Sequence, residues 1–175
     1  LLAGNYTAAF GGGLLLGSDG LLYGTTKFGK ASQIDGAGTI FKIAASGSGF
    51  QVIHRFAAVT GSNQDLNPIN TNGAYPEAEL VEGADGYLYG VARAGGPNGT
   101  GTIFKIARDG TDFRLLHSFA AVTSSSTSGL TVTVDGAAPT GPLVAGTDNF
   151  FYGTTSQGGA NGRGVVFRIA FDGTG

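Results

Sequence analysis

"GTIFKIA" occupies residues 38 to 44 and recurs letter for letter at 101 to 107, and a close variant, "GVVFRIA", follows at 164 to 170. The copies lie 63 residues apart. A fixed spacing of this kind is typical of a tandem array, in which each unit builds the same piece of structure. The rest of the chain can be placed in register on these seven residues.

The alignment brings further segments into register. Before the motif, an aromatic run follows a tight Asp-Gly or Asp-Asn turn in each unit: "LLYGTT" at 21–26, "YLYGVA" at 87–92 and "FFYGTT" at 150–155. A short apolar run precedes each turn, at 14–16, 79–81 and 142–144. After the motif, "FQVIHRFAAVT" at 50–60 matches "FRLLHSFAAVT" at 113–123. The pattern therefore predicts four short antiparallel strands in each unit.

Composition limits the class of protein. Only 13% of the 175 residues are charged, the net charge is −2 and 41% are hydrophobic, which argues against disorder and against a nucleic-acid partner. Cysteine is absent, so disulfides and thiolate metal sites are excluded. No apolar run reaches the length of a membrane span. Glycine is abundant, at 33 residues, and no stretch shows the apolar spacing of a helix over three turns.

These features predict an all-β fold with three repeats of about four antiparallel strands. We expect β-propeller-like blades that form an open arc or part of a larger ring or fibre. The chain is predicted to be a single repeat array over 1–175. Its expected units are a first unit with an N-terminal strand (1–60), a second unit (61–123) and a third unit that lacks its last strand (124–175). The segments from the fourth strand to the next unit are predicted to be long loops.

The same pattern predicts which side chains are buried. The recurrent phenylalanines and tyrosines should pack between sheets; they are Phe41, Phe104, Phe167, Tyr23, Tyr89 and Tyr152. The recurrent cations of the motif, Lys42, Lys105 and Arg168, are expected to extend to a sheet edge.

The combination of "LYGTT", a Gly-Gly connection, "GTIFKI" and an Asp-Gly turn resembles the choice-of-anchor GloVer tandem-repeat family. The resemblance covers nearly all of the chain except the long connections after residues 56 and 119. It implies a β-propeller-like repeat of a bacterial surface or exported protein with no established catalytic activity, and so an extracellular or cell-surface location. It implies no site residues and no cofactor.

Several residues could carry chemistry, and each also has a structural reading. His54 and His117 occupy one repeat position, which favours a shared structural hydrogen bond over a metal site. Glu77 and Glu79, with Asp85, could supply the carboxylate pair of a glycoside hydrolase, but the other units do not repeat them. Asp19, Asp85 and Asp148 could bind calcium, although a tight turn already explains an aspartate there. "GGPNGTG" precedes a strand rather than a helix, which excludes a phosphate loop.

Sugars enter the predictions in two ways. Tyr23, Tyr89 and Tyr152 could serve as repeated sugar platforms, although packing between blades is the favoured reading. Asn5 and Asn98 begin Asn-x-Thr triplets that could accept a glycan. Asn98 is expected in an exposed glycine-rich loop. The segment 122–133 is rich in Ser and Thr, as O-glycosylated linkers and polar surface loops both are.

The sequence thus predicts a non-catalytic, exported structural or adhesive protein whose partners are copies of itself. The chain ends with "FDGTG" at the turn before a fourth strand, and "LLAGNYTAAF" precedes the first unit. We expect the N-terminal segment of one copy to add as a strand to the third unit of the next, with a fibre favoured over a ring. A carbohydrate-binding propeller is the alternative, and a glycoside hydrolase fragment is a weaker one.

Overall fold

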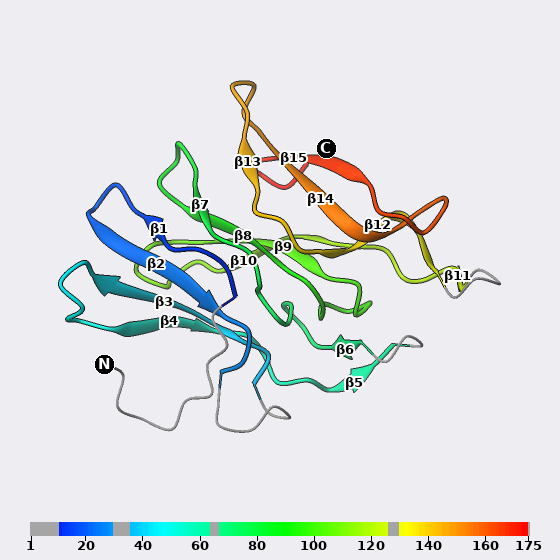
Figure 1. Ribbon diagram of the computed structural model, residues 1–175, viewed down its shortest axis with the longest axis horizontal. Coiled ribbons are helices and arrows are strands. Elements are labelled where there is room, and N and C mark those ends of the chain that lie inside the picture. The colour runs from blue at the N-terminus through cyan, green and yellow to red at the C-terminus, as the bar shows by residue number, and fades with distance from the viewer. Residues whose placement is uncertain (1–10, 30–35, 64–66, 126–129, 175) are drawn as a thin grey trace.

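The structure, a computed structural model, describes residues 11–29, 36–63, 67–125 and 130–174. Within these ranges the chain forms strands and turns, and three antiparallel sheets follow one another from the N-terminal to the C-terminal end (Figure 1). The prediction of an all-β, propeller-like array of three repeats is confirmed. No helix in the described ranges is long and apolar enough to cross a membrane.

The first two sheets have the same simple topology, in which consecutive strands are neighbours. The first sheet contains β1 (Leu15–Leu16), β2 (Leu21–Thr26), β3 (Thr39–Ala44) and β4 (Gln51–Arg55). The second sheet contains β7 (Val81–Glu82), β8 (Leu88–Ala92), β9 (Thr102–Ile106) and β10 (Arg114–Ser118). The short first strands begin one or two residues later than the apolar runs that predicted them. The motif "GTIFKIA" forms the third strand of each sheet.

The third sheet departs from this plan. It contains β13 (Val144–Ala145), β14 (Phe150–Gly159) and β15 (Val166–Ala170), and the far half of β14 also pairs with β12 (Thr131–Pro139). β11 (Ser124–Ser125) pairs with β12. Among the described residues, no strand lies beside β15 in the place that β4 and β10 occupy in the other sheets.

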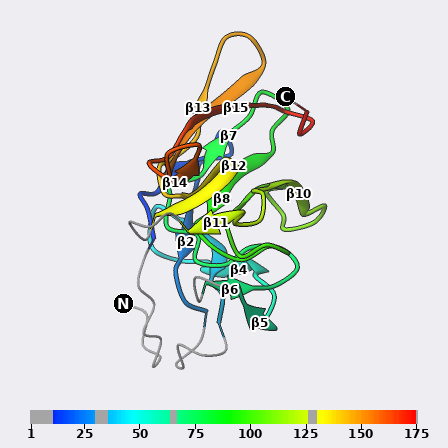
Figure 2. The same ribbon diagram turned by 90° about the vertical axis from the view of Figure 1, so that its right-hand side faces the viewer.

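The connections between units are not the loops that the sequence predicts. The first contains a small hairpin of β5 (Gly61–Ser62) and β6 (Pro68–Ile69), which lies at the end of the molecule away from β13 (Figure 2). It also bridges to the second sheet, because Ala74 pairs with Ala94. In the second connection, Ala137 pairs with Gln157 of β14 in the same way. Here the pair is part of the longer strand β12. Both connections therefore attach one unit to the next.

Close packing on the second strand explains the Tyr-Gly pair of each repeat. Gly24, Gly90 and Gly153 sit opposite a phenylalanine of the third strand in the strand register. A Cβ at Gly90 would lie 2.7 Å from the Phe104 ring, and the first and third sheets show the same approach. A larger residue would displace the ring, so the motif needs Gly on one strand and Phe on its neighbour.

The core consists of two apolar layers, one on each face of the second sheet. The first layer includes Tyr23, Ile40, Leu88, Phe104 and Ile106, and lies between the first and second sheets. The second layer lies between the second and third sheets; it includes Tyr89, Ile103, Leu143, Phe151 and Ile169. Every residue of β8 is buried, as expected for a strand covered on both faces.

The burial prediction is confirmed for part of its residues and wrong for the others. Phe104, Tyr23 and Tyr89 are buried between sheets. Phe41 is buried as well, but against Phe50, 5.3 Å away between ring centroids, rather than against a second sheet. Phe167 is half-buried and packs on the second layer, with its ring centroid 5.4 Å from that of Phe119. Tyr152 is exposed, because no described sheet covers the far side of the third sheet.

Candidate assembly interface

We call the contact between the first and second sheets the first joint, and the contact between the second and third sheets the second joint. Positions in successive units correspond at an offset of 63 residues, or of 66 for residues of the first unit that precede its three-residue insertion. The two joints can therefore be compared residue by residue.

A tyrosine on the second strand of each sheet binds the aspartate of the turn before it. The hydroxyl of Tyr89 donates a hydrogen bond of 2.7 Å to Asp85, and Tyr23 and Tyr152 bind Asp19 and Asp148 at the same distance. Burial, reinforced by the aspartate, raises the pKa of Tyr89. The other carboxylate oxygen of Asp85 accepts from the backbone N–H of Tyr87. The recurrent aspartates thus close the turn and position the tyrosine, which accounts for them without calcium.

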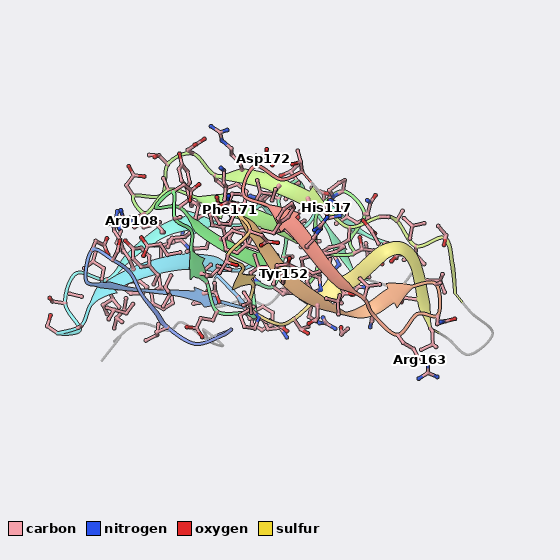
Figure 3. The ribbon with its side chains drawn as sticks, turned by 90° about the horizontal axis from the view of Figure 1, so that it is seen from above. Arg108, His117, Tyr152, Arg163, Phe171 and Asp172 are labelled. Carbon is pink, nitrogen blue, oxygen red and sulfur yellow. The ribbon has the colours of Figure 1, made fainter. Side chains whose placement is uncertain are left out.

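A lysine of the third strand reaches across each joint. Lys42 Nζ donates to the carbonyl oxygen of Arg108 at 3.4 Å, and Lys105 Nζ donates to that of Phe171 at the same distance. The two acceptors are equivalent turn residues of the next sheet. The expectation that the recurrent cations extend to a sheet edge is therefore wrong for Lys42 and Lys105, because both bind the neighbouring sheet. Arg168 is exposed. Figure 3 shows the two acceptor residues, Arg108 and Phe171, at successive positions along the array.

The two histidines make the predicted shared hydrogen bond. His54 Nε2 lies 3.3 Å from Asn72 Nδ2, and His117 Nε2 lies 2.8 Å from Asp135 Oδ2. Asn72 and Asp135 are equivalent residues of the inter-unit connections. Each also accepts from a backbone N–H just after the histidine strand, at Ala57 and Ala120. These hydrogen bonds therefore attach each connection to the sheet that precedes it.

His54 also takes part in the first joint. Its ring stacks on Phe113 of the second sheet with ring centroids 4.0 Å apart and an interplanar angle of 1°. Burial lowers the pKa of His54 to about 4, so the ring is neutral at physiological pH. Across the described residues, no group of three or more His, Asp or Glu side chains is placed to hold a metal ion.

The outer face of the third sheet, formed by Val144, Tyr152, Val166 and Arg168, repeats the buried face of the second sheet. Tyr152 is 36% exposed where its counterpart Tyr89 is 0% exposed, and Val166 is 77% exposed where Ile103 is 1% exposed. Arg168 lies with its guanidinium carbon 4.6 Å from the Phe150 ring centroid. This face has the composition of a joint surface but meets no other described sheet.

The outer face of the first sheet is formed by Leu14, Leu22, Phe41 and Ile43. It corresponds to the face of the second sheet that packs on the first sheet. Leu14 is 51% exposed, whereas its counterpart in the second sheet, Leu80, is 2% exposed against the first. Leu16, beside it, is also exposed, as is Phe50. The two ends of the array thus carry the two halves of an interface that the chain makes twice internally. Sequence repeats alone could have located these faces, since every residue involved belongs to an aligned position.

Most of the remaining predicted site residues are buried or bind other side chains of the protein. Tyr23 and Tyr89 are fully buried, so only Tyr152 offers a ring to a sugar. Glu77 pairs with Lys27 at 2.5 Å, and Asp85 binds Tyr89, so these carboxylates hold structural partners. The Glu77 carboxylate also lies 4.0 Å from Arg93 Nε.

The predicted glycan acceptors differ in what the structure describes. Asn98 is half-buried rather than exposed, because its Nδ2 donates a hydrogen bond of 2.8 Å to the carbonyl of Phe119. Asn5 lies outside the described residues. The Ser/Thr-rich segment 122–133 is described in part, and its described residues include β11 and the start of β12.

The fold is β-propeller-like, and one similar solved structure is a chain of a nidogen/laminin complex, with a TM-score of 0.55, 17% identity and coverage of 96% of this chain and 46% of that one. A gluconolactonase from Xanthomonas campestris matches with a TM-score of 0.46 and 20% identity over 92% of this chain and 44% of its own. The chain thus spans about half the length of these solved structures. The chain belongs to the Gloeobacter/Verrucomicrobia repeat family, which matches residues 13–175. The comparison with curated proteins found no match.

Proposed function

We propose that this chain is a non-catalytic structural or adhesive repeat module, exported or displayed at the cell surface, that joins head to tail with further copies. The observation that carries the proposal is the outer face of the third sheet. It exposes Tyr152 and Val166 at the positions where the second sheet buries Tyr89 and Ile103. A contiguous apolar face of this kind marks a site of protein–protein contact.

The edge of β15 supports the same function. β15 pairs with β14 on one side, and no described strand pairs with its other side. An open edge presents unpaired N–H and C=O groups to a strand from another chain. Strand addition at this edge would bring a neighbouring copy against the outer face of the third sheet. The segment proposed from the sequence as the donor, at the N-terminus, lies outside the described residues.

The titratable groups support a non-catalytic module. An active site needs acids and bases that converge on a common point with perturbed pKa values. Here His54 and His117 each bind a connection of their own sheet, and Glu77 binds Lys27. These contacts hold strands and connections together, which is a structural task.

Sedimentation velocity and electron microscopy of the purified chain test the proposal. We expect assemblies larger than one chain whose proportion rises with protein concentration, and a smaller proportion after deletion of residues 1–8. A sample that remains single-chain particles at every concentration, with and without the deletion, contradicts head-to-tail joining.

The exposed ring of Tyr152 favours carbohydrate binding as the second candidate function. Aromatic faces are common sugar platforms, and Tyr152 is the one tyrosine of its repeat set that is open to solvent. A glycan array distinguishes the two functions. Saturable binding that is lost in Tyr152→Ala and kept in the buried control Tyr89→Phe would favour the sugar-binding candidate.

A further inference from the structure

We infer that the outer face of the third sheet is covered by the outer face of the first sheet of a second copy, so that two copies close one ring of six sheets. The inference rests on the proposed head-to-tail joining. It specifies a second copy as the partner, the residues in contact and a closed ring as the final assembly. It follows from the equivalence of the two exposed faces with the buried faces of the joints.

The third sheet supplies the first half of the contact. At the first joint, Tyr23 and Ile40 of the first sheet pack on the second sheet. At the second joint, their counterparts Tyr89 and Ile103 pack on the third sheet. Tyr152 and Val166 are the next members of the series, and they are exposed. The surface that fits them is therefore the surface that already covers their counterparts.

The first sheet supplies the second half. The residues that receive Tyr23 in the second sheet include Leu80, Leu88 and Ile106, all buried. Their counterparts in the third sheet, Leu143, Phe151 and Ile169, receive Tyr89. In the first sheet the same positions hold Leu14, Leu22 and Ile43. Each of these is apolar and at least partly exposed, so the first sheet offers the receiving face in the same pattern.

A polar contact accompanies the apolar one at each joint. Lys42 donates to the carbonyl of Arg108, and Lys105 donates to the carbonyl of Phe171. The hydroxyl of Tyr89 also lies 3.2 Å from the Phe171 carbonyl oxygen. The next cation in the series is Arg168, and the equivalent turn residue in the first sheet is Ala45. Both are exposed, so the guanidinium of one copy is placed to donate to the Ala45 carbonyl of the other.

Ring closure follows from the number of sheets. Propellers close with about four to eight blades, because fewer sheets cannot fill a ring at the usual twist. Two copies of three sheets give six, within that range. A pair related by a two-fold axis would contain two identical joints of this kind and leave neither face exposed.

Complementary charges placed on the two faces test the inference. Val166→Glu puts a carboxylate on the outer face of the third sheet, and Leu14→Lys puts an ammonium on the outer face of the first. Val134→Glu is the matched control, because Val134 is 79% exposed on β12 and lies on neither face. All three positions are exposed enough for the single chain to stay folded, which circular dichroism checks.

We expect the wild-type protein to sediment as a dimer, with twice the mass of its 17.5 kDa chain. Val166→Glu and Leu14→Lys alone should each raise the dissociation constant of the pair by about tenfold or more, since both place an unpaired charge in a buried contact. An equimolar mixture of the two variants should restore the pair. Val134→Glu should behave as the wild type.

The contrary outcomes separate this inference from the proposed function. A pair that survives Val166→Glu overturns the face contact but leaves head-to-tail joining intact. Assemblies of many copies that Val166→Glu disperses overturn ring closure and likewise leave the proposed function standing. A wild-type chain that is a single particle at all concentrations overturns both.

Discussion

At the rim of the first joint, Ser18, Glu82 and Arg108 form a polar cluster. The Ser18 hydroxyl and backbone N–H both donate to Glu82 at 2.8 Å, and Arg108 Nη1 lies 3.1 Å from the same carboxylate and donates to the Ser18 hydroxyl. At the rim of the second joint, the equivalent positions hold Ala84, Ala145 and Phe171.

Phe171 makes the second rim aromatic instead of charged. Its ring stacks on Phe151 with centroids 4.5 Å apart and lies 5.8 Å from Tyr89. The two joints thus share the tyrosine and the lysine-to-carbonyl contact at their centre. They differ at the rim and at the fourth strand, where the first joint stacks His54 on Phe113. A shared centre sets how sheets stack, whereas a variable rim distinguishes the right neighbour from the wrong one. A sheet docked on the wrong neighbour would leave the Glu82 or Arg108 charge without its partner.

The largest effect is expected in the shared centre. Phe104→Ala removes a ring that packs on Phe56 and Phe113 in the first joint, at 5.3 and 5.6 Å between centroids. It should lower the free energy of unfolding by about 3–5 kcal/mol. Phe167→Ala, at the equivalent and half-buried position, should cost less, about 1–3 kcal/mol. Urea denaturation measures both losses of stability, and equal losses would show that the greater exposure of Phe167 does not weaken its packing.

A medium effect is expected for the tyrosine hydroxyls. Tyr89→Phe removes a buried donor to the Asp85 carboxylate, and hydrogen bonds to charged groups contribute about 1.5–3 kcal/mol. Tyr152→Phe removes the same bond on an exposed surface and should have a much smaller effect on the unfolding midpoint. A loss at Tyr152 as large as that at Tyr89 would mean that burial is not what strengthens the bond.

The first joint should also be the acid-sensitive one. Burial lowers the pKa of His54 to about 4 from the 6.5 of an exposed imidazole. The unfolded state therefore binds a proton first, so stability is complete above pH 6.5 and falls as the pH drops towards 4. His54→Gln should flatten this part of the pH profile of unfolding. The carboxylates titrate in both proteins, so the difference between the two profiles reports the ring, and identical slopes would contradict the prediction.

The smallest effect is expected at the charged rim. Glu82→Gln should cost about 0.5–1 kcal/mol, because the ion pair with Arg108 is partly exposed to water. Raising the salt concentration should reduce that loss. Ala145→Gln, the matched change in the aromatic rim, should be insensitive to salt. A salt response in both variants would show that the difference between the rims is not electrostatic.

The sequence predicts the local features of each unit well. The spacing of Phe41, Phe104 and Phe167 locates the third strands, and the Asp-Gly and Asp-Asn turns locate the hairpins, because both signals lie within a few residues of the structure they specify. The histidine bond was also predictable, since a position that recurs on one strand has the same surroundings in each unit.

Contacts between units were harder to predict. Lys105 binds the carbonyl of Phe171, 66 residues away, and no local pattern marks a backbone acceptor in another sheet. The strand β12 carries the alternation "TVTV", which is a strand signal, but it lies in a segment whose glycines and serines read as a loop. The exposure of Tyr152 reflects that no described sheet lies against its face, and a repeat pattern treats all units as equal.

The consecutive order of strands in the first two sheets has a consequence for how the chain folds. Each hairpin forms between neighbouring segments, so little loop entropy is lost before a sheet gains its first contacts, and folding of such topologies is fast. A sheet alone buries little, and its stability comes from docking on the next, as in a one-dimensional array with nearest-neighbour coupling. The second sheet has two neighbours and the end sheets have one described neighbour each. Amide hydrogens should therefore exchange slowest in β8 and β9 and faster towards both ends, with opening that begins at an end sheet and stops at the centre.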